Sequence, residues 1–276
     1  MHRFGIRTKL KSLKKYLPIP PLALSSPEGG IVPFPALDAG ERALLRRVSR
    51  KIHPADNMLH FGLGHYFGVG LSASRAIRRA VTAAGLKPQR VLDFPCGYGR
   101  VLRFLKAAYP DAQFTASDLE RDGVDFCARG LSATGIHSSV NLDEVNLGEP
   151  FDLIWVGSLL THFDEKKIAE AMQFFRKNLR AGGLLVFTAH GSGPVYRMRH
   201  KTLGYGLSAE DEARLLDGYE ASGYGFAEYE AGSGYGISLT SPAWIRRLMS
   251  EARWREVYFE DQAWDNHQDV FGFVPE

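Results

Sequence analysis

The chain has 276 residues, enough for one large α/β domain with additions or for two small domains. Hydrophobic residues make up 45% and charged residues 24%, as in ordinary globular proteins, and no run of 18 apolar residues suggests a membrane span. There is no apolar segment with a small-residue cleavage site at the start, and Cys96 and Cys127 are too few for a disulfide scaffold, so we expect a cytoplasmic protein.

The net charge of +3 conceals an asymmetry between the first residues and the rest of the chain. Six basic residues precede the first acidic one, Glu28, and without them 28 basic residues face 31 acidic ones. They are interspersed with apolar residues at helical spacing, which predicts an amphipathic arm over 1–17. Peripheral contact with an anionic membrane or an acidic partner is one interpretation, and a solvated arm is the other. The mildly acidic remainder argues against a nucleic-acid partner.

A proline-rich stretch, 18–36, predicts an extended linker, so we place the domain at 37–276. Asp38 can cap a helix whose apolar face continues to Ile52. The glycine- and aromatic-rich stretch 60–70 is expected to be a loop, and a second helix is expected over 72–84.

From residue 90 onward, short apolar runs alternate with segments of helical period. Strands are predicted at 90–94, 112–118, 136–140, 151–157, 183–189, 255–261 and 269–275. Helices between most of them indicate an α/β fold with a doubly wound, mostly parallel, seven-stranded sheet. The loop between the last two strands is too short for a helical crossover, so the last strand is expected to be antiparallel. Residues 191–240, rich in glycine and tyrosine, are expected to form an insertion between strands five and six. It is interpreted as a substrate lid, with a surface insertion or dimer contact as the alternative.

The segment 91–100 ends a strand, turns through Gly97 and Gly99, and opens a helix. Such a turn lets backbone approach a ligand closely. Asp118, at the end of the next strand, is placed to accept hydrogen bonds from a ribose diol. The dinucleotide pattern G-x-G-x-x-G fails because Leu102 stands at the third glycine. These features indicate an adenosine-containing cofactor without identifying it.

The same loop resembles motif I of class I S-adenosylmethionine-dependent methyltransferases, D-x-G-x-G-x-G, with Pro95 in place of the first glycine. "EPFDLIWVGSLLTHF" resembles the family's motif IV, and "LRAGGLLVF" resembles its L-x-P-G-G-x-L motif. The ending "WDNHQDVFGF" resembles methyltransferases associated with glycan or lipopolysaccharide biosynthesis. The resemblance implies a Rossmann-like methyltransferase fold, S-adenosylmethionine as cofactor, and a small-molecule or glycan acceptor.

The resemblance also implies which residues contact the cofactor. Its methionine part would lie against Tyr66, Asp93 and the Phe94–Gly97 segment, with Pro95 and Cys96 in that loop. Asp118 would hold the ribose, and the adenine would contact Leu119, Ser139 and Val140. Gly157 and Ser158 would line the sulfonium.

Three histidines fall near the carboxyl ends of predicted strands, where ligands bind in doubly wound sheets. We expect His162, His190 and His267 to be the candidates for proton transfer in methylation of an acceptor hydroxyl, such as that of a sugar or glycan precursor. No set of acidic residues indicates a metal site. A nicotinamide-dependent oxidoreductase and a non-catalytic cofactor-binding scaffold remain the alternatives.

Overall fold

The computed structural model describes residues 37–276. The predicted basic arm, 1–17, and the proline-rich linker, 18–36, lie outside the described residues. Within residues 37–276, no helix combines the length and the apolar character needed to cross a bilayer.

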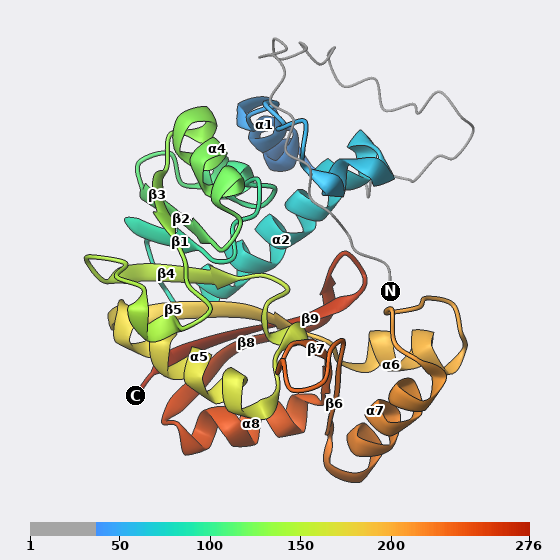
Figure 1. The fold of residues 1–276 in the computed structure, drawn as a ribbon. Coiled ribbons are helices and arrows are strands. Elements are labelled where there is room, and N and C mark those ends of the chain that lie inside the picture. The colour runs from blue at the N-terminus through green and yellow to red at the C-terminus, as the bar shows by residue number, and fades with distance from the viewer. Residues whose placement is uncertain (1–36) are drawn as a thin grey trace.

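A seven-stranded sheet forms the centre of the molecule, in the order β3-β2-β1-β4-β5-β9-β8 (Figure 1). The strands are β1 (Arg90–Asp93), β2 (Gln113–Asp118), β3 (Thr134–His137), β4 (Phe151–Val156), β5 (Leu179–Ala189), β8 (Trp254–Trp264) and β9 (Gln268–Pro275). The first five pair in parallel, and β9 runs antiparallel to both β5 and β8. This is the predicted fold class, with the antiparallel last strand inserted beside β5.

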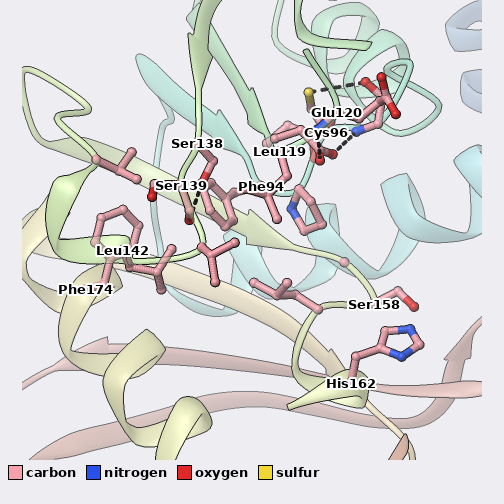
Figure 2. A pocket seen from close by; sticks show the side chains of 18 of the residues that line it. Phe94, Cys96, Leu119, Glu120, Ser138, Ser139, Leu142, Ser158, His162 and Phe174 are labelled. Atoms are coloured by element: carbon pink, nitrogen blue, oxygen red, sulfur yellow. Dashed lines mark hydrogen bonds between the residues drawn. The ribbon is translucent and has the colours of Figure 1, made fainter. Parts of the chain in front are cut away.

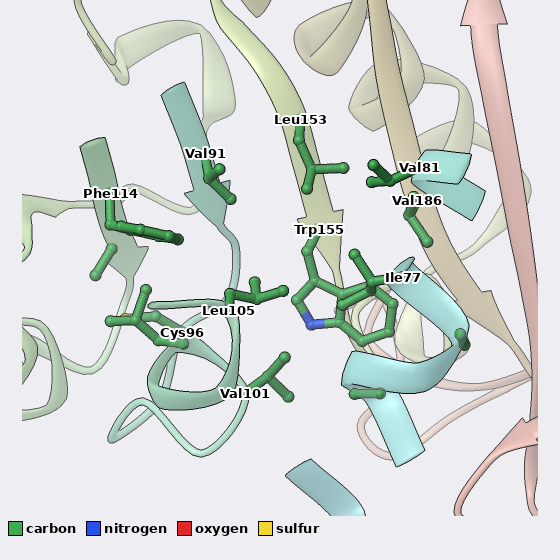
Figure 3. Packing of buried hydrophobic residues seen from close by; sticks show 14 of the residues in the cluster. Ile77, Val81, Val91, Cys96, Val101, Leu105, Phe114, Leu153, Trp155 and Val186 are labelled. Carbon is green, nitrogen blue, oxygen red and sulfur yellow. The ribbon is translucent and has the colours of Figure 1, made fainter. Parts of the chain in front are cut away.

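Helices cover both faces of the sheet (Figure 1). They are α2 (Leu63–Ala83), α3 (Leu102–Ala108), α4 (Arg121–Leu131), α5 (Glu165–Asn178) and α8 (Pro242–Glu251), and α1 (Ala39–Arg47) packs on α2 and α3. Alternate residues of β4 supply the two cores. Leu153 and Trp155 pack with α2, α3 and α4 (Figure 3), whereas Ile154 and Val156 pack with α5 and α8. Burial on both faces explains why this strand is nearly all apolar.

Residues 60–70 are helical, so the prediction of a loop there is wrong. A short 3₁₀ helix, η1 (Asn57–Phe61), leads through Gly62 into α2, which continues for 21 residues. Glycine lowers helix propensity, but here it permits close packing. A Cβ on Gly70 would lie 2.3 Å from the Phe104 ring of α3. Tertiary packing therefore outweighs the local preference.

The third strand also differs from its prediction, because it covers Thr134–His137 and not 136–140. Its final pair joins Asp118 to His137, and β2 ends at Asp118. No backbone of β2 remains to pair with later residues, so Ser139 and Val140 lie in the loop that follows.

The insertion between β5 and β8 folds into regular elements with a small core of its own. It contains α6 (Ser192–Arg199), α7 (Ala209–Ser222) and a two-stranded sheet of β6 (Tyr224–Glu228) and β7 (Gly236–Thr240). Its buried apolar residues are Val195, Met198, Leu215, Ala227, Ile237 and Leu239. The insertion lies at one end of the main sheet, beside the β8–β9 hairpin (Figure 1).

The close approach of α2 and α3 predicts opposite effects for two glycines on one helix. Gly70→Ala should lower the free energy of unfolding by about 1–3 kcal/mol, because the added methyl overlaps Phe104 and the Arg100 carbonyl. Gly68→Ala is the matched control. A Cβ there meets nothing within 4 Å, so the variant should be unchanged or more stable by up to about 1 kcal/mol. Urea unfolding measures both, and equal effects would contradict the packing described.

Candidate functional site

A cavity of about 1390 Å³ opens at the carboxyl ends of β1, β2 and β4 (Figure 2). Its walls come from the loop after β1, the end of β2, the loop after β3 and the loop after β4. The residues predicted to contact a cofactor gather here, apart from Tyr66. They are Asp93, Phe94, Pro95, Cys96, Gly97, Asp118, Leu119, Ser139, Val140, Gly157 and Ser158.

The loop after β1 is held in a tight conformation by its neighbours. Gly97 and Gly99 have φ values of +49° and +72°, a region that side chains disfavour. The Gly97 N–H donates to Asp118 Oδ2 at 2.7 Å, and the Cys96 N–H donates to the Ser117 carbonyl at 3.0 Å. A Cβ on Gly123 of α4 would lie 2.5 Å from the Gly97 carbonyl oxygen. The loop is therefore fixed between β2 and α4.

Asp93 lies at the end of β1 and is almost fully buried at 1% exposure. Burial raises the pKa of its carboxyl well above the ordinary value, the Asp118 charge adds to this, and a hydrogen bond from the Leu102 N–H opposes it. Its Oδ2 has no hydrogen-bond partner among residues 37–276. A buried acceptor left without a partner costs free energy, so this oxygen is suited to a donor on a ligand.

The end of β2 combines a polar anchor with apolar walls. Asp118 accepts the N–H groups of Gly97 and, at 3.0 Å, Glu120. Leu119 is 57% exposed although it is apolar, and Val140 on the facing loop is 81% exposed. Leu142 and Phe174 extend these walls (Figure 2). Apolar faces beside a carboxylate suit a nucleoside, whose base is flat and whose ribose donates hydrogen bonds.

Tyr66 does not line the cavity, which corrects its predicted position over a cofactor. Its side chain is fully buried in α2, and its hydroxyl donates to Asp56 Oδ2 at 2.7 Å. The cause is the unpredicted extension of α2, which turns this face of the helix toward α1 and α3. Asp56 lines the cavity in its place.

His162 ends a 3₁₀ turn, η3 (Leu160–His162), and lines the cavity (Figure 2). Its Nδ1 lies 2.8 Å from the Gly236 carbonyl oxygen, so Nδ1 carries a proton and donates. Burial lowers the pKa of the ring, although the Gly236 bond opposes this. A neutral imidazole with Nδ1 protonated keeps Nε2 as a proton acceptor. The ring stacks on Tyr235, with centroids 5.2 Å apart.

His190 and His267 lie together, but they do not line the cavity with His162. Their ring centroids are 5.3 Å apart, and both rings contact Tyr205 of the insertion. The insertion covers the end of β5, where the His190 carbonyl accepts the Thr240 N–H, and this buries His190 to 4% exposure. Burial lowers the pKa of His190 well below its usual value and that of His267 to about 4.

The histidine cluster adjoins the cavity through Gln268, whose Nε2 donates to Ser158 Oγ at 3.0 Å. The neighbouring Asp269 is fully buried, and burial raises its pKa to about 7, with the Asp261 charge adding to the effect. Across residues 37–276, no group of three or more His, Cys, Asp or Glu side chains is arranged to hold a metal ion.

Sequence reasoning missed Arg100 and Trp264, which both line the cavity. Arg100 directly follows Gly99, so its position in the glycine loop was a usable signal. Trp264 opens the segment "WDNHQDVFGF", but the sequence did not indicate that it reaches the site through the β8–β9 hairpin. Its Nε1–H donates to the Val69 carbonyl of α2 at 3.1 Å.

Residues 92–185, about a third of the chain, match a protein family described as a methyltransferase domain. The chain is 27% identical over 124 residues to malonyl-[acyl-carrier protein] O-methyltransferase from Anoxybacillus flavithermus. The matching region covers 45% of this chain and 47% of that protein. It is 31% identical over 116 residues to phthiotriol/phenolphthiotriol dimycocerosates methyltransferase 1 from Mycobacterium ulcerans. That matching region covers 40% of this chain and 41% of the relative. The chain thus spans less than half the length of these curated relatives.

A solved S-adenosylmethionine-dependent methyltransferase from Clostridium acetobutylicum superimposes with a TM-score of 0.52 at 14% identity, over 74% of this chain and 91% of the other. At that identity the similarity concerns the fold. The strand order and the antiparallel β9 are those of the Rossmann-like methyltransferase fold.

The buried carboxyl of Asp269 predicts a dependence of stability on pH. Folded Asp269 keeps its proton up to about pH 7, whereas an unfolded aspartic acid loses it near about pH 3.9. The folded state binds more protons in between, so this group makes stability fall as the pH rises from about 4 to about 7.

Asp269→Asn keeps the shape and the ability to donate toward Asp261, but it does not titrate. Relative to wild type, its free energy of unfolding should be similar near pH 4 and higher by about 2–4 kcal/mol near pH 7.5. Urea unfolding across this range provides the measurement. A difference that is constant with pH, or that favours wild type as the pH rises, would show that Asp269 ionises normally.

Proposed function

We propose that this protein binds S-adenosylmethionine in the cavity at β1, β2 and β4 and transfers its methyl group to a small-molecule acceptor. One observation carries the proposal. The cavity joins the anchored glycine loop, the carboxylate of Asp118 and the buried carboxyl of Asp93 at the carboxyl ends of parallel strands. The methyltransferase-domain match over residues 92–185 covers these three features and supports the assignment.

The residues present fit this cofactor. Asp118 would accept hydrogen bonds from the ribose hydroxyls, between the apolar walls of Leu119 and Val140. Asp93 would accept from the ammonium of the methionine part through its unpartnered Oδ2. Gly157 and Ser158 would flank the sulfonium, which supplies a methyl group activated for displacement.

For the acceptor, we propose a hydroxyl group, such as that of a sugar or glycan precursor. His162 lines the cavity with Nε2 available, so it would take the hydroxyl proton. The insertion contributes the Tyr229 and Tyr235 rings beside His162, and both are partly exposed. Tyrosine rings offer flat apolar surface with a polar edge, which suits the face of a sugar. Residues 191–240 would then cover the acceptor as a lid.

His190 and His267 have a different part in this proposal. They adjoin Gln268, which contacts Ser158, so we propose that they place neutral groups behind Ser158 and hold Tyr205. The two curated relatives are named for acceptors of other kinds, a malonyl-acyl-carrier protein and phthiotriol compounds. The sugar class therefore depends on the tyrosines beside His162.

Ligand-induced stabilisation separates this function from that of a nicotinamide-dependent oxidoreductase. S-adenosylhomocysteine should raise the melting temperature, because it binds only the folded state, and at 100 times its Kd the stabilisation is about 2.7 kcal/mol. NAD⁺ at the same concentration should leave the melting temperature unchanged, since the third glycine of its loop motif is replaced by Leu102. Differential scanning fluorimetry makes the comparison. Stabilisation by NAD⁺ alone would refute the proposal.

The role of His162 is tested by His162→Gln, which can still donate to the Gly236 carbonyl. We expect kcat to fall by about 10²- to 10⁴-fold, with the Kd for S-adenosylhomocysteine unchanged, because the variant loses the proton acceptor only. Transfer of labelled methyl from S-adenosylmethionine to nucleotide sugars or methyl glycosides gives the rate.

His137→Gln is the matched control, because His137 is exposed on β3 and pairs with Asp125 outside the cavity. It should retain wild-type turnover. Wild-type activity in His162→Gln would remove His162 from the mechanism. Cofactor binding without transfer to any acceptor in wild type would favour a non-catalytic scaffold.

A further inference from the structure

Arg100 occupies an unusual position for a cation. It belongs to the turn between Gly99 and α3, and it lines the same cavity as Asp93. Its side chain is half-buried, and this burial lowers the pKa of its guanidinium. Removing a charged group from water is unfavourable unless an opposite charge compensates for it.

No such compensation is present in the part of the chain that the structure describes, where no carboxylate lies within 4.0 Å of the Arg100 guanidinium. Two acids are near enough to act on it electrostatically, but both have other partners. Asp56 accepts the Tyr66 hydroxyl and the Met58 N–H. Asp265 pairs with His65 at 3.6 Å.

The neighbouring Arg103 shows how this region accommodates a cation that serves packing alone. Arg103 is almost completely buried, and its guanidinium donates to the carbonyls of Gly99, Tyr98, Ser49 and Lys51. Arg100 makes none of these bonds. Its guanidinium lies over the Trp264 ring, whose centroid is 6.0 Å from Cζ. Five N–H donors therefore remain beside the cavity.

Arg100 and Asp93 complement each other across the loop. Asp93 contributes an acceptor oxygen without a partner, and Arg100 contributes a planar set of donors without a carboxylate partner. A zwitterionic α-amino acid group carries an ammonium for the first and a carboxylate for the second. Guanidinium and carboxylate bind each other through two parallel hydrogen bonds.

We infer that Arg100 binds the carboxylate of the methionine part of S-adenosylmethionine, while Asp93 accepts from its ammonium. The inference rests on the proposed function, and it assigns the cofactor specificity of the cavity to a residue outside the family motif described above. Binding to Arg100 would also orient the cofactor. Its amino acid end would lie toward α3 and Trp264, and its methyl group would lie toward Ser158 and His162.

The test compares two ligands that differ only by the carboxylate, S-adenosylmethionine and decarboxylated S-adenosylmethionine. In Arg100→Gln, S-adenosylmethionine should bind about 10- to 100-fold more weakly than in wild type, because a charge-assisted hydrogen-bonded pair is lost. Binding of the decarboxylated ligand should change by less than about threefold. Isothermal titration calorimetry gives both affinities.

Two further variants complete the experiment. Arg129→Gln removes an exposed arginine of α4 and should leave both affinities unchanged. Arg100→Lys keeps the charge without the planar donors, and it should show a smaller loss for S-adenosylmethionine alone; it also provides the readout if Arg100→Gln does not fold. Equal losses for both ligands, or no loss, would overturn the assignment to Arg100. Absence of binding of either ligand to wild type would instead overturn the proposed function, and with it this inference.

Discussion

The hydrogen bond from the Gly97 N–H to Asp118 Oδ2 is the interaction on which the arrangement of the site depends. It joins the loop after β1 to the end of β2, and the loop can approach α4 only because residues 99 and 123 lack side chains. The same bond keeps Asp118 at the edge of the cavity. It also fixes the loop from which the chain continues through Arg100 into α3. A change at any of these positions would therefore alter several walls of the cavity at once.

The second organising feature is the burial of ionisable groups around the cavity. Asp93 and Asp269 have raised pKa values, and His162, His190 and His267 have lowered ones, in each case chiefly because of burial. These shifts all favour the neutral form. His162, which lines the cavity, is thus kept as a neutral imidazole, whereas Arg100 and Lys167 contribute cations elsewhere in the lining. A methyl transfer in which a neutral imidazole takes a proton is compatible with these surroundings.

Most of the fold could be predicted from the sequence because a doubly covered sheet has a simple pattern. Strands such as β4 are nearly all apolar, and the helices between them have clear periodicity. The errors arose where distant contacts decide the structure. Gly70 packs against Phe104 within α2, and β3 ends where β2 ends. His190 is buried by β7, which belongs to the predicted insertion 191–240. Arg100 was missed because it lies outside the motif that marked its neighbours.

The most direct test of the account is a crystal structure of the protein with S-adenosylhomocysteine. We predict that the ribose hydroxyls contact Asp118, that the adenine lies between Leu119 and Val140, and that the amino acid group lies between Asp93 and Arg100. The sulfur should then lie beside Ser158, on the side of His162. A ligand bound elsewhere, or one whose amino acid end lies toward His162 with Arg100 unengaged, would contradict the account.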